Sequence, residues 1–185
     1  MKNPYKYTER QMMLSKMIRK LWVQHVMWTR SFIISSAEEL GDLDQVTTRL
    51  LRNPTDFARA LSMFYNQRTV DQFHELFTQH LEIAASLVGA AKEGDTAKAQ
   101  YYRNEWYQNA EEIAEFLAKI NPYWNKQVWE KLLFDHLKMT EMEATYRLNK
   151  QYEEDIQIYD KIEKEALKMA DYMVEGIIKQ FNFLW

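Results

Sequence analysis

Three of the four histidines occupy positions at which a helix of this sequence should carry apolar residues. His25 falls in a stripe of apolar residues that recur every three or four positions between residues 14 and 32, the spacing of one helix face. His80 and His136 fall in similar stripes further along the chain. Their imidazoles should therefore point into the protein, where neutral ring nitrogens can bind a transition metal.

The turns between helices predict that three polar side chains lie at one level. The turn at residues 94–95 is about equally far from His80 and from Asn109, and the turn at 121–122 is about equally far from Asn109 and from His136. Antiparallel helices rise about 1.5 Å per residue from a shared loop, so these side chains should form one layer about 20 Å from the loops. His25 is a candidate fourth member, whose level cannot be counted because a long excursion follows its helix.

A layer of this kind predicts a buried site for one transition-metal ion such as zinc, iron or manganese. The Glu-x-x-His pattern of di-iron proteins does not occur, and four histidines are too few for an oxygen carrier of the hemerythrin type. Glu112 and Glu143 are the candidate carboxylate ligands beside the three histidines. Asn109, Trp28 and Thr140 are expected to surround the ligands. The reaction of such a metal-binding protein is left open.

The same residues also fit a purely structural layer. A buried histidine is commonly held by a hydrogen bond, and Asn109 is an obvious partner. Such a layer can set helix register, as a buried asparagine does in coiled coils. The alternative function is therefore a non-catalytic interaction or scaffold protein, and a small-molecule pocket is a third interpretation. The fourth histidine, His74, lies off its stripe and is expected at the surface.

Composition and missing motifs exclude several other classes of protein. The chain has no cysteine, which excludes disulfides and thiolate chemistry, and a formal net charge of -3, which gives no reason to expect nucleic acid as a partner. No segment resembles a signal peptide or an apolar membrane span, so we expect a cytoplasmic protein without membrane contact. No glycine-rich phosphate loop or Gly-x-Ser-x-Gly elbow occurs, so no nucleotide cofactor and no nucleophilic hydrolase is expected.

The fold class follows from length and from the scarcity of helix breakers. With 185 residues, 46% of them hydrophobic, and only three prolines and four glycines, the chain predicts a single all-α domain over residues 1–185. We expect an antiparallel four-helix bundle. Its first helix covers 8–40 and ends at Gly41, and two short helices are inserted after it, the second with Asn53 as N-cap. The second and third bundle helices cover about 70–93 and 96–120.

The fourth helix, from about 125 to 180, is too long for its neighbours. A continuous helix would approach 80 Å, against about 40 Å for the others. We therefore expect a kink in the polar stretch 149–155, although no proline or glycine enforces one. The apolar stripe beyond the kink must cover the short helices, the first helix or a second subunit. This last option predicts a homodimer through the C-terminal helix.

Several motifs resemble known bacterial proteins. The run 21–30, which contains Trp22, His25 and Trp28, together with 49–56 and the segments around His80, Asn109 and His136, resembles a group of small bacterial all-α proteins, some of which carry the label acetylglutamate kinase. More distantly, these segments are similar to the metalloprotein-like four-helix bundles of bacilli. That resemblance implies a helical bundle that holds a metal. In those bundles a glutamate follows the last histidine by four residues, whereas this sequence has Thr140 there.

Overall fold

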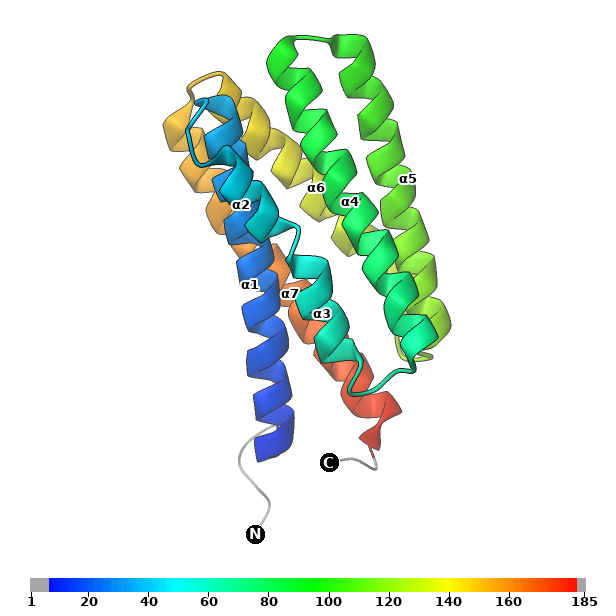
Figure 1. Ribbon diagram of the computed structural model, residues 1–185. Coiled ribbons are helices and arrows are strands. Elements are labelled where there is room, and N and C mark those ends of the chain that lie inside the picture. The colour runs from blue at the N-terminus through cyan, green and yellow to red at the C-terminus, as the bar shows by residue number, and fades with distance from the viewer. Residues whose placement is uncertain (1–6, 183–185) are drawn as a thin grey trace.

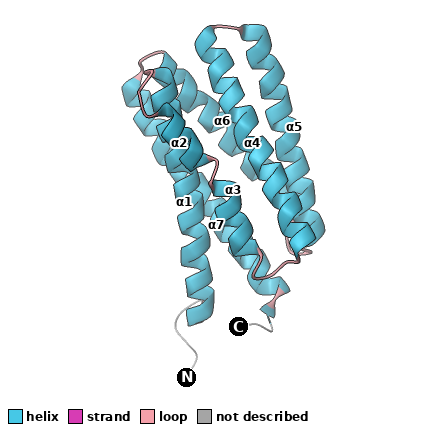
Figure 2. Cartoon of the chain, in the orientation of Figure 1, coloured by secondary structure: helices cyan, strands magenta, loops and turns pink. Residues whose placement is uncertain are grey.

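The computed structural model describes residues 7–182, and this part of the chain is all-helical, with no strand (Figures 1 and 2). It contains five long helices and two short ones. In chain order they are α1 (Glu9–Ala37), α2 (Leu43–Leu50), α3 (Asn53–Leu61), α4 (Gln67–Glu93), α5 (Thr96–Ile120), α6 (Lys126–Leu148) and α7 (Tyr152–Gln180). The predicted all-α class is confirmed. The predicted count of four long helices is not, because the C-terminal segment forms two.

The long helices pack side by side in alternating directions. α4 packs along α5, α6 lies between α5 and α7, and α7 also packs along α1. α1, α4 and α6 run in one direction, whereas α5 and α7 run in the other (Figure 1). The short helices α2 and α3 bring the chain back along α1, so that α4 starts near the level at which α1 began (Figure 1). This return explains how helices far apart in sequence place their histidines together.

Polar caps define the helix starts, in part as the sequence predicts. Thr8 caps α1 in a reciprocal capping box with Gln11. Asn53 is not an N-cap, because Arg52 holds that position and Asn53 already lies inside α3. Gly41 does not end α1 either. The helix stops at Ala37 and the left-handed residue is Glu39, with a φ of 54°.

The predicted kink in the last segment is a full reversal of the chain. α6 ends at Leu148 and α7 starts at Tyr152, so the break falls inside the polar stretch 149–155. Lys150 adopts a left-handed φ of 58°, and the amide of Gln151 donates to the carbonyl of Tyr146. The turn lays α7 back along α6. The long C-terminal helix predicted from the sequence is therefore an antiparallel pair.

The apolar stripe of α7 is covered within the chain. Met169, Met173 and Ile177 are fully buried where α7 packs on α1 and α6. Gly176 permits a close approach, since a Cβ at this position would lie 1.9 Å from the indole nitrogen of Trp124. The stripe therefore needs no second subunit to cover it. Across residues 7–182, every helix falls short of the length and apolar character that a membrane span requires.

Candidate functional site

The three histidines of the predicted layer are buried and come from three parallel helices. His25 of α1, His80 of α4 and His136 of α6 are 2%, 3% and 2% exposed. Their inward orientation, predicted from the apolar stripes, is confirmed. His74, predicted at the surface, lies off this layer and contacts Thr55 through its Nε2.

His80 is held in one orientation by Asn109 of α5. Its Nδ1 lies 2.8 Å from the Oδ1 of Asn109. The amide nitrogen of Asn109 donates to the backbone carbonyl of Leu76 at 3.1 Å, which fixes the amide so that its oxygen faces the ring. Nδ1 of His80 must then carry the proton, and Nε2 keeps its lone pair. The predicted contact between these two residues is confirmed.

His25 and His136 face each other without such support. Their ring centroids lie 5.5 Å apart, and the ring of Phe77 lies 5.3 Å from that of His25 and 6.2 Å from that of His80. Within the described part of the chain, Nδ1 of His25 and Nδ1 of His136 are buried and have no hydrogen-bond partner. Buried nitrogens are normally paired, so these two require an explanation, as do the unpaired indole nitrogens of Trp22 and Trp129, which line the same part of the core.

A small cavity lies between the three imidazoles. Its volume is about 20 Å³, enough for one water molecule or one ion. Its wall is otherwise apolar and aromatic and includes Met173 of α7. Of the described residues that line it, none carries a formal charge apart from any proton on the histidines. The wall is wholly apolar in this arrangement, so an ion or a water molecule in the cavity would be ligated only after the neutral rings turn their nitrogens toward it.

Burial keeps the three imidazoles neutral. It lowers the pKa of His80 to about 4, although the hydrogen bond that the ring donates to Asn109 acts in the opposite direction. It lowers the pKa of His136 to about 3, with a further contribution from His80. The pKa of His25 is well below its ordinary value, because of burial first and the two other histidines second. No proton has to be displaced from these rings at neutral pH before a metal can bind.

The predicted carboxylate ligands are not at this cavity. Glu112 is exposed at the surface of α5, where Gln108 donates to its Oε1. Glu143 is 1% exposed, but its Oε1 accepts from Arg30 at 2.6 Å. As far as the described residues go, neither glutamate lines the space between the imidazoles. Glu143 lies on the buried face of α6, as His136 does, but seven residues further along, which is about 10 Å by helical rise, whereas Glu112 lies on the exposed face of α5.

The predicted surrounding residues divide in the same way. Asn109 contacts a histidine ring, as described above. Thr140 donates its hydroxyl to the backbone carbonyl of His136 at 3.0 Å, so it contacts the backbone and not the ring. Trp28 packs under the guanidinium of Arg49, with 4.9 Å between the guanidinium carbon and the ring centroid.

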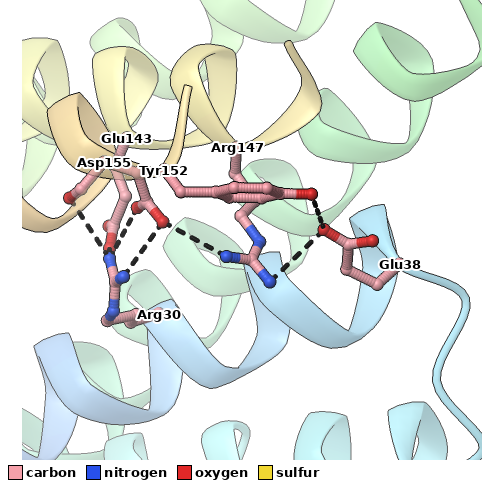
Figure 3. A network of polar contacts seen from close by, with 6 residues as sticks. All are labelled: Arg30, Glu38, Glu143, Arg147, Tyr152 and Asp155. Atoms are coloured by element: carbon pink, nitrogen blue, oxygen red, sulfur yellow. Dashed lines mark hydrogen bonds and ion pairs between the residues drawn. The ribbon is translucent and has the colours of Figure 1, made fainter. Parts of the chain in front are cut away.

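A second polar cluster, buried at Glu143 and Asp155 and partly exposed elsewhere, lies further along α1, α6 and α7 (Figure 3). We call it the charge network, and it comprises Arg30, Glu38, Glu143, Arg147, Tyr152 and Asp155. Arg30 bridges Glu143 and Asp155, with 2.6 Å to an oxygen of each, and Arg147 connects Asp155 to Glu38. Burial raises the pKa of Glu143 to about 7, although Arg30 opposes the rise. This network clamps the turn between α6 and α7 onto α1.

Two further observations bear on function. Among the described residues, no group of three or more His, Cys, Asp or Glu side chains has a preformed metal-binding arrangement. No family model, curated protein or solved structure matches the chain. The resemblance drawn from the sequence therefore stays a prediction, and any function must be argued from the site itself.

Met173 is a residue of the site that the sequence reasoning missed. It belongs to the apolar stripe 159–177 and looks like ordinary core. Its position at the imidazole cavity follows from the reversal at Lys150, which lays α7 against the layer. The available signal was the break itself, since a helix that folds back on α6 brings its apolar face to the same core.

Proposed function

We propose that the imidazole cavity binds one transition-metal ion through His25, His80 and His136. We further propose that α1, α4, α5, α6 and α7 form the helical bundle around it. The observation that carries the proposal is the pair of buried, unpartnered nitrogens on His25 and His136. Leaving a polar group unpaired in the interior costs about 1–3 kcal/mol, which a bound metal would offset. Because the rings are not preformed as a ligand set, metal binding would turn them toward the cavity.

The contact between His80 and Asn109 supports the same function. Metal-binding histidines almost always donate their other ring nitrogen to a carbonyl or carboxylate, which leaves the second nitrogen free for the metal. Asn109 supplies this carbonyl at 2.8 Å, and it is itself held by the carbonyl of Leu76. His80 is therefore the ligand whose orientation is set before any metal arrives.

The cavity favours an ion of low charge. All its candidate ligands are neutral, and no carboxylate lines it among the described residues, so a divalent ion would bring two uncompensated charges into an apolar space. Copper(I) would bring only one positive charge, and it is a soft ion that binds imidazole and thioether ligands. Met173 supplies a thioether at the same cavity. We therefore place copper(I) above zinc, iron and manganese as the occupant.

Metal titration of protein prepared without a histidine tag tests the proposal. Under anaerobic conditions and in competition with a copper(I) chelator, one copper(I) per chain should bind, at least 100-fold more tightly than zinc. His136→Ala and His80→Ala should each weaken copper binding by 100-fold or more. Asn109→Leu should weaken it by about 10- to 100-fold, the usual effect of losing an outer partner of a ligand. His74→Ala is the matched control and should bind within twofold of the original protein.

The competing function is a scaffold protein in which one buried water molecule fills the cavity. The absence of a preformed ligand group in the described residues favours it. It predicts no stoichiometric metal under any condition, with the three histidine variants and Asn109→Leu all behaving like the original protein. That result, obtained on folded protein as judged by circular dichroism, would reject the metal proposal. Pairing with a second copy stays a separate prediction, which a sedimentation measurement of the intact chain can test.

A further inference from the structure

A larger cavity lies one helical turn beyond the imidazole layer. Thr29, Ala84 and Thr140 line it, and each follows one of the three histidines by four residues. α1, α4 and α6 run in the same direction, so this shared offset of four residues places the cavity about 6 Å toward their C-terminal ends. Trp106 of α5 lines it as well and packs against His80, with 5.3 Å between the ring centroids.

The size and lining of this cavity suit a small organic molecule. Its volume is about 210 Å³ and its wall is mainly aliphatic. For comparison, an engineered apolar cavity of about 150 Å³ stays dry and binds benzene. The space beyond the imidazole layer is therefore large enough for about eight carbon atoms. Alanines on opposite walls, Ala84 of α4 and Ala144 of α6, leave the volume free.

The polar groups of the wall favour an uncharged ligand that donates one hydrogen bond. The hydroxyls of Thr29, Thr140 and Thr145 each donate to the carbonyl four residues earlier, which leaves their oxygens as acceptors. Arg103 and Glu141 are the only charged residues among the described ones that line the cavity. They form an ion pair at 2.9 Å, and both side chains are partly exposed. The pair therefore adds no net charge to the wall of the cavity.

We infer that this cavity binds an uncharged, mostly hydrocarbon molecule of about eight carbons with a single hydroxyl, such as a medium-chain alcohol. Its hydrocarbon part would lie among the aliphatic side chains of α1, α4 and α6. Its hydroxyl would donate to a threonine oxygen. The inference goes beyond the proposed function and needs no metal. Because Trp106 touches both the cavity and His80, its fluorescence should report the ligand.

Calorimetric titration with 1-octanol tests this inference on metal-free protein. One molecule should bind per chain, with octanoate and octylammonium at least tenfold weaker. Ala84→Leu should fill the space and weaken 1-octanol binding at least tenfold. Ala144→Leu fills it from the opposite wall and keeps the test decisive if the first variant does not fold. Ala118→Leu, on α5 and outside the cavity, is the matched control and should bind as the original protein does.

The outcomes separate this cavity from the metal site. Octanol binding that survives in a folded Ala84→Leu or Ala144→Leu variant overturns the inference, as does tighter binding of octanoate or no saturable binding at all. His136→Ala should still bind 1-octanol within about threefold, whatever its affinity for copper. A protein that binds octanol but no metal would therefore reject the proposed function and leave the cavity inference in place.

Discussion

The imidazole layer and the charge network are built on the same helices and differ in how their polar groups are satisfied. α1 contributes His25 to the layer and Arg30 to the network, and α6 contributes His136 and Glu143. In the network, the guanidinium of Arg30 contacts two carboxylates, those of Glu143 and Asp155. In the layer the rings are neutral, and two ring nitrogens have no partner among the described residues.

This difference indicates which region serves stability and which is available for a ligand. Each charged group of the network faces an opposite charge across α1, α6 and α7 (Figure 3), although the Nε of Arg147 is buried and has no hydrogen-bond partner among the described residues. Breaking it would leave buried charges without compensation. The layer gains little from its polar nitrogens in the described arrangement, since only His80 has a ring hydrogen bond there. A ligand bound at the layer would account for the ring nitrogens that have no partner.

The two regions differ most in how their contribution to folding stability changes when the pH is lowered. In the layer, the pKa is about 4 for His80 and about 3 for His136, below the ordinary value of 6.5. As the pH falls, these histidines therefore take up protons in the unfolded chain before they do so in the folded protein. Their contribution to stability is complete above pH 6.5 and is lost as the pH falls toward 4. Glu143 has a raised pKa of about 7 against an ordinary 4.5, so its contribution is present below pH 4.5 and is lost as the pH rises toward 7.

Glu143→Gln should therefore expose the response of the layer. Between pH 6.5 and 4.5, the unfolding free energy of this variant should fall by at least about 5 kcal/mol, and that of the original protein by about 2 kcal/mol less, because Glu143 offsets part of the loss. Denaturant unfolding of metal-free protein at the two pH values measures this. Equal losses in both proteins would contradict the raised pKa of Glu143. No loss in either would contradict the lowered pKa values of the imidazoles.

Breaking the network at its centre should give the next largest effect. Arg30→Met removes the charge shared by Glu143 and Asp155, both only 1% exposed, and should lower the unfolding free energy by about 3–5 kcal/mol at pH 7. Arg19→Met is the control, because Arg19 pairs with Asp171 at the surface and such a pair is worth about 0–1 kcal/mol. Chemical denaturation at equilibrium gives both values. Similar losses for the two variants would show that burial adds nothing to the Arg30 cluster.

The layer was more predictable from the sequence than the network. The periodic stripes place His25, His80 and His136 inward, and equal distances from one turn pair His80 with Asn109. Both inferences use the periodicity and the rise of a helix. These depend only on residues that lie close together in the sequence. The partner of Glu143 is 113 positions away in α1, and no spacing rule reaches that far. For this reason Glu143 was predicted at the layer when it belongs to the network.

Turns that contain no glycine were the second feature that the sequence did not predict. The polar stretch 149–155 indicated a break, but Lys150 takes up the left-handed geometry that usually requires glycine, so the sequence suggested a kink in place of a turn. At Gly41 the prediction was wrong for the opposite reason. A glycine is present there, but Glu39 takes the left-handed position after α1. The octanol-sized cavity could not be predicted either. It arises where small residues such as Ala84 and Ala144 line the space between helices, and only the packing of helices distant in sequence reveals that space.

The smallest expected effects compare the histidines with one another. His80→Leu leaves the oxygen of Asn109 buried without its donor and should lower the unfolding free energy by about 1–3 kcal/mol at pH 7. His136→Leu removes a buried nitrogen that has no partner in the described chain, so it should change stability by less than about 1 kcal/mol and can raise it. Denaturant unfolding of metal-free protein measures both. A large loss in His136→Leu would mean that this nitrogen is already paired, by a bound water, and that the layer is as complete as the charge network.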